Sequence, residues 1–210
     1  MNSLPEQFNL AEHLFALNRA RGDRIAYIDD QGPLSYSALE DRARRLATVL
    51  ANAGVRREER VLLLMLDTSD WPVVFLGCLY AGVVPVAANT LLKPDDYAYM
   101  LTHCRAQAAL VSGALLPVLN EALALAHHHK VRACVVSQAK GPLGAGAVDM
   151  QAAMANTPAL AAPARTGPDE QGFWLYSSGS TGKPKGTVHT QGSLWWTAEL
   201  YRKAVLGLAD

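Results

Sequence analysis

The sequence predicts an α/β protein with a mainly parallel sheet flanked by helices, because two kinds of segment alternate along its 210 residues. Short runs in which nearly every residue is apolar are typical of strands that are buried on both faces. Between them, apolar residues recur three or four positions apart, which is typical of helices that cover such a sheet. Half of the residues are hydrophobic and 18% are charged, as in a folded globular protein.

The chain is expected to begin with a helix, a strand and a turn. Asn9, followed three positions later by Glu12, predicts a capping box for a helix that ends near Gly22. A strand over residues 24–28 follows, and the run DDQGP predicts the turn after it.

A second helix is expected from Ser37, which forms a capping box with Glu40, to Gly54, which ends it. Its apolar residues recur at helical spacing. The charged residues fall on the opposite side and are expected to be solvated: Glu40, Asp41, Arg44 and Arg45.

Residues 71–88 contain no charge and are numerous enough to span a membrane. Two prolines and two glycines interrupt the run: Pro72, Gly77, Gly82 and Pro85. This punctuation instead favours a buried helix, capped by Ser69 or Asp70 and running through Tyr80, followed by a buried strand over residues 83–88.

The other expected elements are strands over 60–66, 108–111 and 131–136, a helix that opens at Lys93-Pro94, and a helix over 114–126. Glycine, proline and alanine are frequent in residues 138–170, where we expect one weak helix over 150–155. We interpret residues 138–170 as a long surface connection. A strand begins after it, at residue 171.

The charge balance argues against several classes of partner. Lysine plus arginine and aspartate plus glutamate both number 19, so the formal net charge is zero. Without a long basic run, neither nucleic acid nor an anionic membrane is predicted as a partner. The N-terminus has no basic start followed by an apolar run, so no signal peptide is predicted. Nothing in the sequence indicates an oligomeric state.

The cysteines and histidines favour structural roles. Cys78, Cys104 and Cys134 are scattered and form no CxxC pair, which predicts reduced core thiols in a cytoplasmic protein. A reactive thiol or a zinc site is the less favoured alternative. Residues 127–129 are all histidine, but consecutive helical side chains point about 100° apart. We therefore expect a helix end there and no protein-held metal.

The residues that predict chemistry lie in the run YSSGSTGKPKGTVHT, residues 176–190. Its glycines allow positive φ and close backbone approach to a ligand: Gly179, Gly182 and Gly186. Its hydroxyl groups belong to Ser177, Ser178, Ser180, Thr181 and Thr187, and its positive charges to Lys183 and Lys185. Backbone N–H, hydroxyl and ammonium groups together are the donors that a polyphosphate needs. This predicts a phosphate-binding loop, and the alternative is a flexible surface loop.

The loop does not match the Walker A pattern, which requires G-x-x-x-x-G-K followed by serine or threonine. Pro184 follows Lys183, and Ser177 stands where the first glycine would be. Proline favours an extended conformation in the residue before it. The Gly-Thr-Val after Lys185 therefore predicts a short strand leaving the loop.

The same run closely resembles the signature of the acyl-adenylate-forming superfamily, which includes acyl- and aryl-CoA synthetases, luciferases and peptide-synthetase adenylation domains. The segments LSYSALEDRARRLATVL and LGCLYAGVVPVAANTLL resemble two further motifs of that superfamily. The similarity covers the whole chain and is loosest between Gly113 and Arg165. SDWPVVFLGCLYAGVVPVAANTLL and HTQGSLWWTAELYRKAVLGL are most similar to bacterial benzoate–CoA and hydroxybenzoate–CoA ligases.

The resemblance implies that an aromatic carboxylic acid is activated with ATP and Mg²⁺ to an acyl-adenylate and then transferred to coenzyme A. It implies that the ATP phosphates are bound by Ser177, Ser178, Gly179, Ser180, Thr181, Gly182, Lys183, Lys185 and Gly186. Lys185, in the P-K-G step, is the expected catalytic residue. A fatty-acyl or other carboxylate–CoA ligase and a non-catalytic nucleotide-binding protein remain alternatives.

The resemblance also implies that residues 1–210 are an incomplete N-terminal domain of an AMP-forming ligase, in which residues 171–190 form the strand and phosphate loop. The acid pocket, the adenine and ribose contacts, the magnesium-binding glutamate and the C-terminal domain would lie outside it. We therefore expect the chain alone not to form a thioester. Trp195 and Trp196 are expected in the core, not in an aryl pocket, and His189 as a satisfied polar residue at a strand end.

Overall fold

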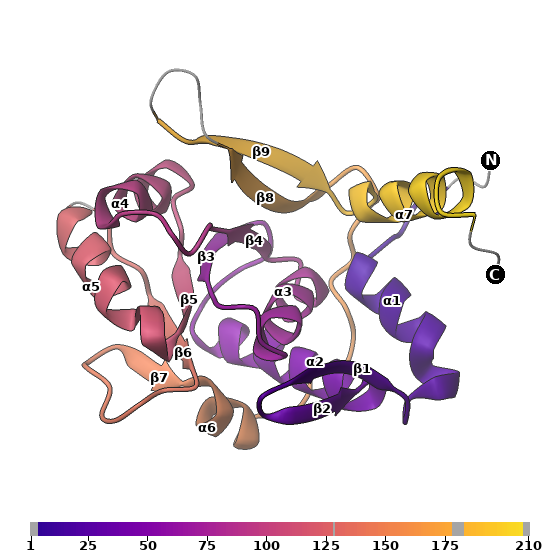
Figure 1. Ribbon diagram of the computed structural model, residues 1–210, viewed down its shortest axis with the longest axis horizontal. Helices are drawn as coiled ribbons and strands as arrows, with labels where there is room; N and C mark the ends of the chain where they lie inside the picture. Colours follow the sequence, from indigo (N-terminus) through magenta and orange to yellow (C-terminus); the bar gives the residue numbers. More distant parts are fainter. Residues whose placement is uncertain (1–3, 128, 178–182, 208–210) are drawn as a thin grey trace.

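The computed structural model describes residues 4–127, 129–177 and 183–207 (Figure 1). In this part of the chain, seven strands form one sheet in the order β7-β6-β5-β3-β4-β8-β9. They are β3 (Arg60–Leu64), β4 (Val84–Ala87), β5 (Ala108–Ser112), β6 (Ala133–Ser137), β7 (Ala147–Asp149), β8 (Gln171–Ser177) and β9 (Lys185–Thr190). Every pairing is parallel except that of β8 with β9. The predicted α/β class with a mainly parallel sheet is therefore confirmed.

Helices cover both faces of this sheet (Figure 1). One face is covered by α2 (Tyr36–Asn52), α3 (Asp70–Tyr80) and α6 (Met150–Ala155), with α1 (Leu10–Asn18) packed on α3. The other face is covered by α4 (Pro94–His103) and α5 (Leu116–Leu125). Two short 3₁₀ turns, Arg19–Arg21 and Gly113–Leu115, adjoin α1 and α5, and α7 (Ser193–Ala204) follows β9.

Alternation along the strands divides the core into two layers. Val61 and Leu63 of β3 belong to the layer under α2 and α3, whereas Leu62 and Leu64 belong to the layer under α4 and α5. Burial on both faces explains why these strands are apolar at every position.

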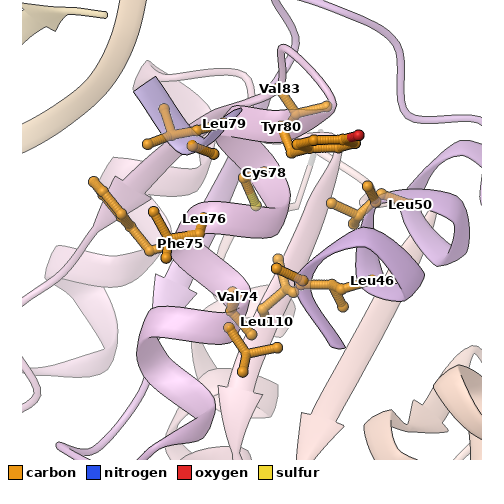
Figure 2. Packing of buried hydrophobic residues seen from close by; sticks show 14 of the residues in the cluster. Leu46, Leu50, Val74, Phe75, Leu76, Cys78, Leu79, Tyr80, Val83 and Leu110 are labelled. Atoms are coloured by element: carbon orange, nitrogen blue, oxygen red, sulfur yellow. The ribbon is translucent and has the colours of Figure 1, made fainter. Parts of the chain in front are cut away.

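Helix α3 lies in the first layer, where Figure 2 shows its side chains among those of α2 and β5. At Gly77 a Cβ atom would lie 2.7 Å from the Ala43 carbonyl oxygen, so a side chain there would force α2 and α3 apart. The uncharged run thus forms a buried helix, a turn at Gly82 with φ of +68°, and β4, as predicted. Among the described residues, no helix is long and apolar enough to cross a membrane.

Two helix starts can be compared with their predicted caps. The Asn9 side chain accepts a hydrogen bond from the Glu12 backbone N–H, as expected. The predicted cap Ser37 is wrong, because Ser35 caps α2 and its hydroxyl accepts from the Ala38 N–H at 3.2 Å. The reason is a hairpin of β1 (Ile25–Asp29) and β2 (Gly32–Ser35), whose second strand leads directly into α2.

The charged face of α2 also departs from expectation. Arg44 Nε donates to the Leu160 carbonyl at 2.9 Å, and an Arg45 guanidinium N–H donates to the Thr157 carbonyl at 2.9 Å. These two arginines therefore bind the backbone of residues 157–161 in addition to their i,i+4 carboxylate partners. The expectation of a purely solvated face is wrong for them.

A buried carboxylate links three elements at the edge of the sheet where the parallel strands end. Asp70, at the first position of α3, accepts a hydrogen bond from the Ser137 hydroxyl at 2.5 Å and forms an ion pair with Arg42 of α2. Asp70 is only 8% exposed, so the Ser137 hydroxyl and the Arg42 guanidinium take the place of most of the water molecules that would otherwise solvate its carboxylate.

The cysteines are buried, as predicted for core thiols. Burial raises the pKa of Cys104 and of Cys134 to about 11. Helix α5 ends at Leu125, so the expected helix end lies just before the histidine run. Within that run, His129 Nε2 lies 2.5 Å from the Ala106 carbonyl oxygen. His128 lies outside the described residues.

Candidate functional site

The residues that flank the predicted phosphate loop, Ser177 at the end of β8 and Lys185 at the start of β9, are paired at the edge of the sheet where the parallel strands end (Figure 1). Ligands of α/β proteins bind outside this edge, where the carboxyl ends of the strands and their loops converge. The expected strand after Lys185 is confirmed as β9. Five of the predicted site residues lie outside the described residues: Ser178, Gly179, Ser180, Thr181 and Gly182.

Ser177 and Lys185 form the cross-strand pair next to the loop. Leu175 and Thr187 form the next pair on that face, because alternate residues of a strand share one face. Ser177, Lys185 and Thr187 are all exposed. The hairpin therefore presents two hydroxyl groups and one ammonium group on one accessible face, which fits a polyphosphate.

Gly186 does not have the positive φ that was expected of it. It lies within β9 opposite Tyr176, and the glycines with positive φ do not include it. A Cβ atom at this position would lie 3.1 Å from the Trp174 ring and 3.4 Å from the Tyr176 ring. The missing side chain therefore lets β9 pack closely on two aromatic rings.

The two lysines lie on different sides of the hairpin. Lys183 Nζ is 5.3 Å from the centre of the Tyr99 ring, on the side where α4 packs. Because Gly186 faces the aromatic rings on that same side, the adjacent residue Lys185 points to the opposite side. Only Lys185 thus shares a face with Ser177 and Thr187.

Helix α4 supports the end of the hairpin that bears the loop. The Tyr176 hydroxyl lies 2.7 Å from Nδ1 of His103, whose ring stacks on Tyr99 at 5.2 Å and also meets the edge of Trp174. Burial raises the pKa of Tyr176, so the phenol stays protonated. Its O–H group can therefore donate a hydrogen bond to Nδ1 in the His103 tautomer whose Nδ1 carries no hydrogen.

Sequence reasoning missed these α4 contacts. Tyr99 and His103 are four positions apart, which places them on one helix face, and Trp174 and Tyr176 alternate along a strand. Each pair has a recognisable spacing, but nothing in the sequence connects the two pairs.

The other aromatic candidates lie away from the loop. Trp195 packs against the core, as expected, and meets the Trp196 ring edge at a centroid distance of 4.6 Å. His189 stacks face to face on Phe173 at 4.6 Å, so its main described partner is an aromatic ring.

Comparisons with known proteins identify the family of the chain. The family described as "AMP-binding enzyme" matches residues 14–208. Benzoate–CoA ligase of Thauera aromatica is 42% identical over 210 residues, covering 99% of this chain and 38% of that protein. A benzoate CoA ligase structure from Burkholderia xenovorans has a TM-score of 0.84 and 50% identity, over 96% of this chain and 38% of that one.

A second solved structure is that of an anthranilate CoA ligase in complex with anthranoyl-AMP. It has a TM-score of 0.90 and 30% identity, over 98% of this chain and 39% of that one. The chain therefore spans well under half the length of the relatives that it matches.

Proposed function

Because the chain belongs to the AMP-binding enzyme family, we propose that it provides the ATP-phosphate-binding hairpin of an AMP-forming ligase that joins an aromatic carboxylic acid to coenzyme A. The main support is the shared face of Ser177, Lys185 and Thr187 at the carboxyl edge of a parallel sheet. The similarity to benzoate and anthranilate CoA ligases supports the aromatic class of acid.

The reaction has two substitutions. First, a carboxylate oxygen attacks the α-phosphorus of ATP, the bond to the β-phosphate breaks, and pyrophosphate leaves. The thiolate of coenzyme A then attacks the acyl carbon, and AMP leaves. The first step increases negative charge on the departing pyrophosphate, which fixed cationic and hydrogen-bond donors stabilise.

The hairpin residues suit this first step. Lys185 would place an ammonium group beside the β- and γ-phosphates, and Ser177 and Thr187 would donate hydroxyl hydrogens to their oxygens. Ser177 and Lys185, with Lys183, Gly186 and residues 178–182, are the predicted phosphate contacts, and Thr187 is added to them because it shares the face of Ser177 and Lys185.

Mg²⁺ would accompany ATP, since it binds nucleotides through phosphate oxygens and one or two carboxylates. Within the described ranges, no group of three His, Cys, Asp or Glu side chains could hold a metal. The resemblance places the magnesium-binding glutamate outside residues 1–210, and phosphate oxygens of ATP would supply further ligands of the ion. The three buried thiols support action in a reducing compartment, which fits the cytoplasm.

A chimera tests this function. Residues 1–210 would replace the matching segment of the Thauera aromatica benzoate–CoA ligase, and AMP release would be followed with benzoate, acetate and a long-chain fatty acid. The proposal predicts AMP release with benzoate that depends on ATP and on coenzyme A. A correctly folded chimera that releases no AMP with benzoate, ATP and coenzyme A would contradict the proposal that residues 1–210 provide the ATP-activating part of such a ligase.

A further inference from the structure

The end of the β8–β9 hairpin that bears the loop extends past the neighbouring strand. Strand β4 pairs with β8 only at Trp174 and Leu175, so the last two residues of β8, Tyr176 and Ser177, have no ladder partner on that side. A two-stranded ribbon without further support is only marginally stable in water. The positions of the loop ends therefore depend on contacts outside the sheet.

Helix α4 makes such contacts on both sides of the loop. Before residues 178–182, Tyr176 is hydrogen bonded to His103 at 2.7 Å. After them, Lys183 lies over the Tyr99 ring at 5.3 Å. The two partners on α4 stack on each other with an angle of 21° between the rings. One stacked pair of side chains thus contacts Tyr176 before the loop and Lys183 after it.

The helix that holds this pair is itself well fixed. Tyr97, Met100 and Leu101 of α4 are at most 1% exposed and belong to the core layer on that side of the sheet. A contact with α4 therefore ties the hairpin to the packed core.

We propose that His103 is a positioning residue for ATP binding, which holds Tyr176 and hence the start of the phosphate loop, and that Tyr99 fixes the His103 ring. This inference rests on the proposed function. If the hairpin end is already held in place before ATP binds, ATP binding does not have to supply the free energy that orders it. The contact therefore raises the affinity for ATP by increasing the fraction of chains whose hairpin can bind.

Three variants separate the contact from its surroundings. His103→Leu removes the hydrogen-bond acceptor and the ring, and Tyr176→Phe removes only the hydroxyl. His103→Asn keeps an acceptor atom near the position of Nδ1 and is the conservative rescue. Tyr97→Phe is the matched control, because its hydroxyl bonds to the backbone of Asn89 and Leu92 and not to the hairpin.

Two measurements on the 210-residue chain follow. Without nucleotide, trypsin cleavage after Lys185 reports how often the hairpin end opens. The dissociation constant for ATP with Mg²⁺ reports the effect on binding. We expect both the cleavage rate and the dissociation constant to rise about fivefold in His103→Leu and Tyr176→Phe. His103→Asn should remain within about twofold of wild type, and Tyr97→Phe should lower thermal stability without either change.

Several results would overturn the inference. Wild-type cleavage and affinity in both His103→Leu and Tyr176→Phe would contradict it, as would equal effects in Tyr97→Phe, which would indicate general loosening of α4. If His103→Leu does not fold, the cleavage rate and the dissociation constant of Tyr176→Phe alone test the inference. Absence of AMP release by the folded chimera described above would reject the proposed function, whereas the cleavage rates without nucleotide would still test the positioning contact.

Discussion

Gly186 lies directly opposite Tyr176 across the β8–β9 hairpin, and a Cβ atom at residue 186 would lie 3.4 Å from the Tyr176 ring. The same Cβ atom would lie 3.1 Å from the Trp174 ring, so the missing side chain leaves room for both aromatic rings. The conformation of Gly186 is that of a strand residue, so the constraint comes from the space between β9 and the aromatic rings.

Gly186→Val tests this packing. The added atoms would meet Trp174 and Tyr176 and force β9 away from them, which should destabilise the chain by about 1–3 kcal/mol. Urea unfolding followed by tryptophan fluorescence measures the change. Gly144→Val is the control, because a Cβ atom at residue 144 would meet open space. Equal stability of the two variants would contradict the packing role.

Asp70→Ala should be strongly destabilising. It leaves Arg42 without its ion-pair partner and the buried Ser137 hydroxyl without its acceptor, which should lower the free energy of unfolding by about 2–4 kcal/mol. Urea unfolding measures this, with the exposed Asp23→Ala expected to change it by less than about 0.5 kcal/mol. A loss in Asp70→Ala no larger than that control would show that the network does not stabilise the fold.

The hydrogen bond to the Asp29 carboxylate predicts that part of the stability of the fold is lost at acidic pH. This carboxylate accepts a hydrogen bond from the Ser69 backbone N–H at 2.7 Å, which lowers its pKa below the ordinary value of 3.8. Since the ionised form is favoured in the fold, its stabilising effect is complete above that ordinary value and is lost as the pH falls through the lower folded-state value.

Unfolding by urea at a series of pH values tests this sign. The difference in stability between wild type and Asp29→Ala should be constant near neutral pH and should shrink below a pH of about 4. A difference that persists unchanged to a pH of about 2 would contradict the contribution of the charged hydrogen bond.

Much of the fold could be predicted because each buried strand and helix has a local pattern. The run from Trp71 to Ala88 is apolar throughout because α3 and β4 are both inside the core, and Pro72 and Gly82 mark its boundaries. The likeness of the loop to the acyl-adenylate-forming superfamily is likewise confirmed by the family match over residues 14–208.

The features that were missed depend on contacts between distant parts of the chain. Ser35 and Ser37 are both suitable caps, and only the pairing of β2 with β1 selects Ser35. The roles of Arg44 and Arg45 depend on where residues 157–161 return to α2. The contact of His103 with Tyr176 spans 73 positions, so neither residue alone indicates it.

The sequence distinguished the two lysines only through the resemblance, in which the P-K-G step favours Lys185 as the catalytic residue. It provided no physical reason for the difference, because both are cations next to the loop. Strand alternation and the Tyr99 contact distinguish them, leaving Lys185 on the face with Ser177 and Thr187.

Titration calorimetry of the 210-residue chain with ATP and Mg²⁺, comparing wild type, Lys185→Ala and Lys130→Ala, tests the phosphate-binding role of the hairpin. Lys130 is exposed in the segment between α5 and β6, so Lys130→Ala removes the same charge elsewhere. Loss of a charge-assisted contact to phosphate should weaken ATP binding at least about tenfold in Lys185→Ala and leave Lys130→Ala unchanged. Equal affinity in all three proteins would contradict the assignment of Lys185 to the ATP phosphates.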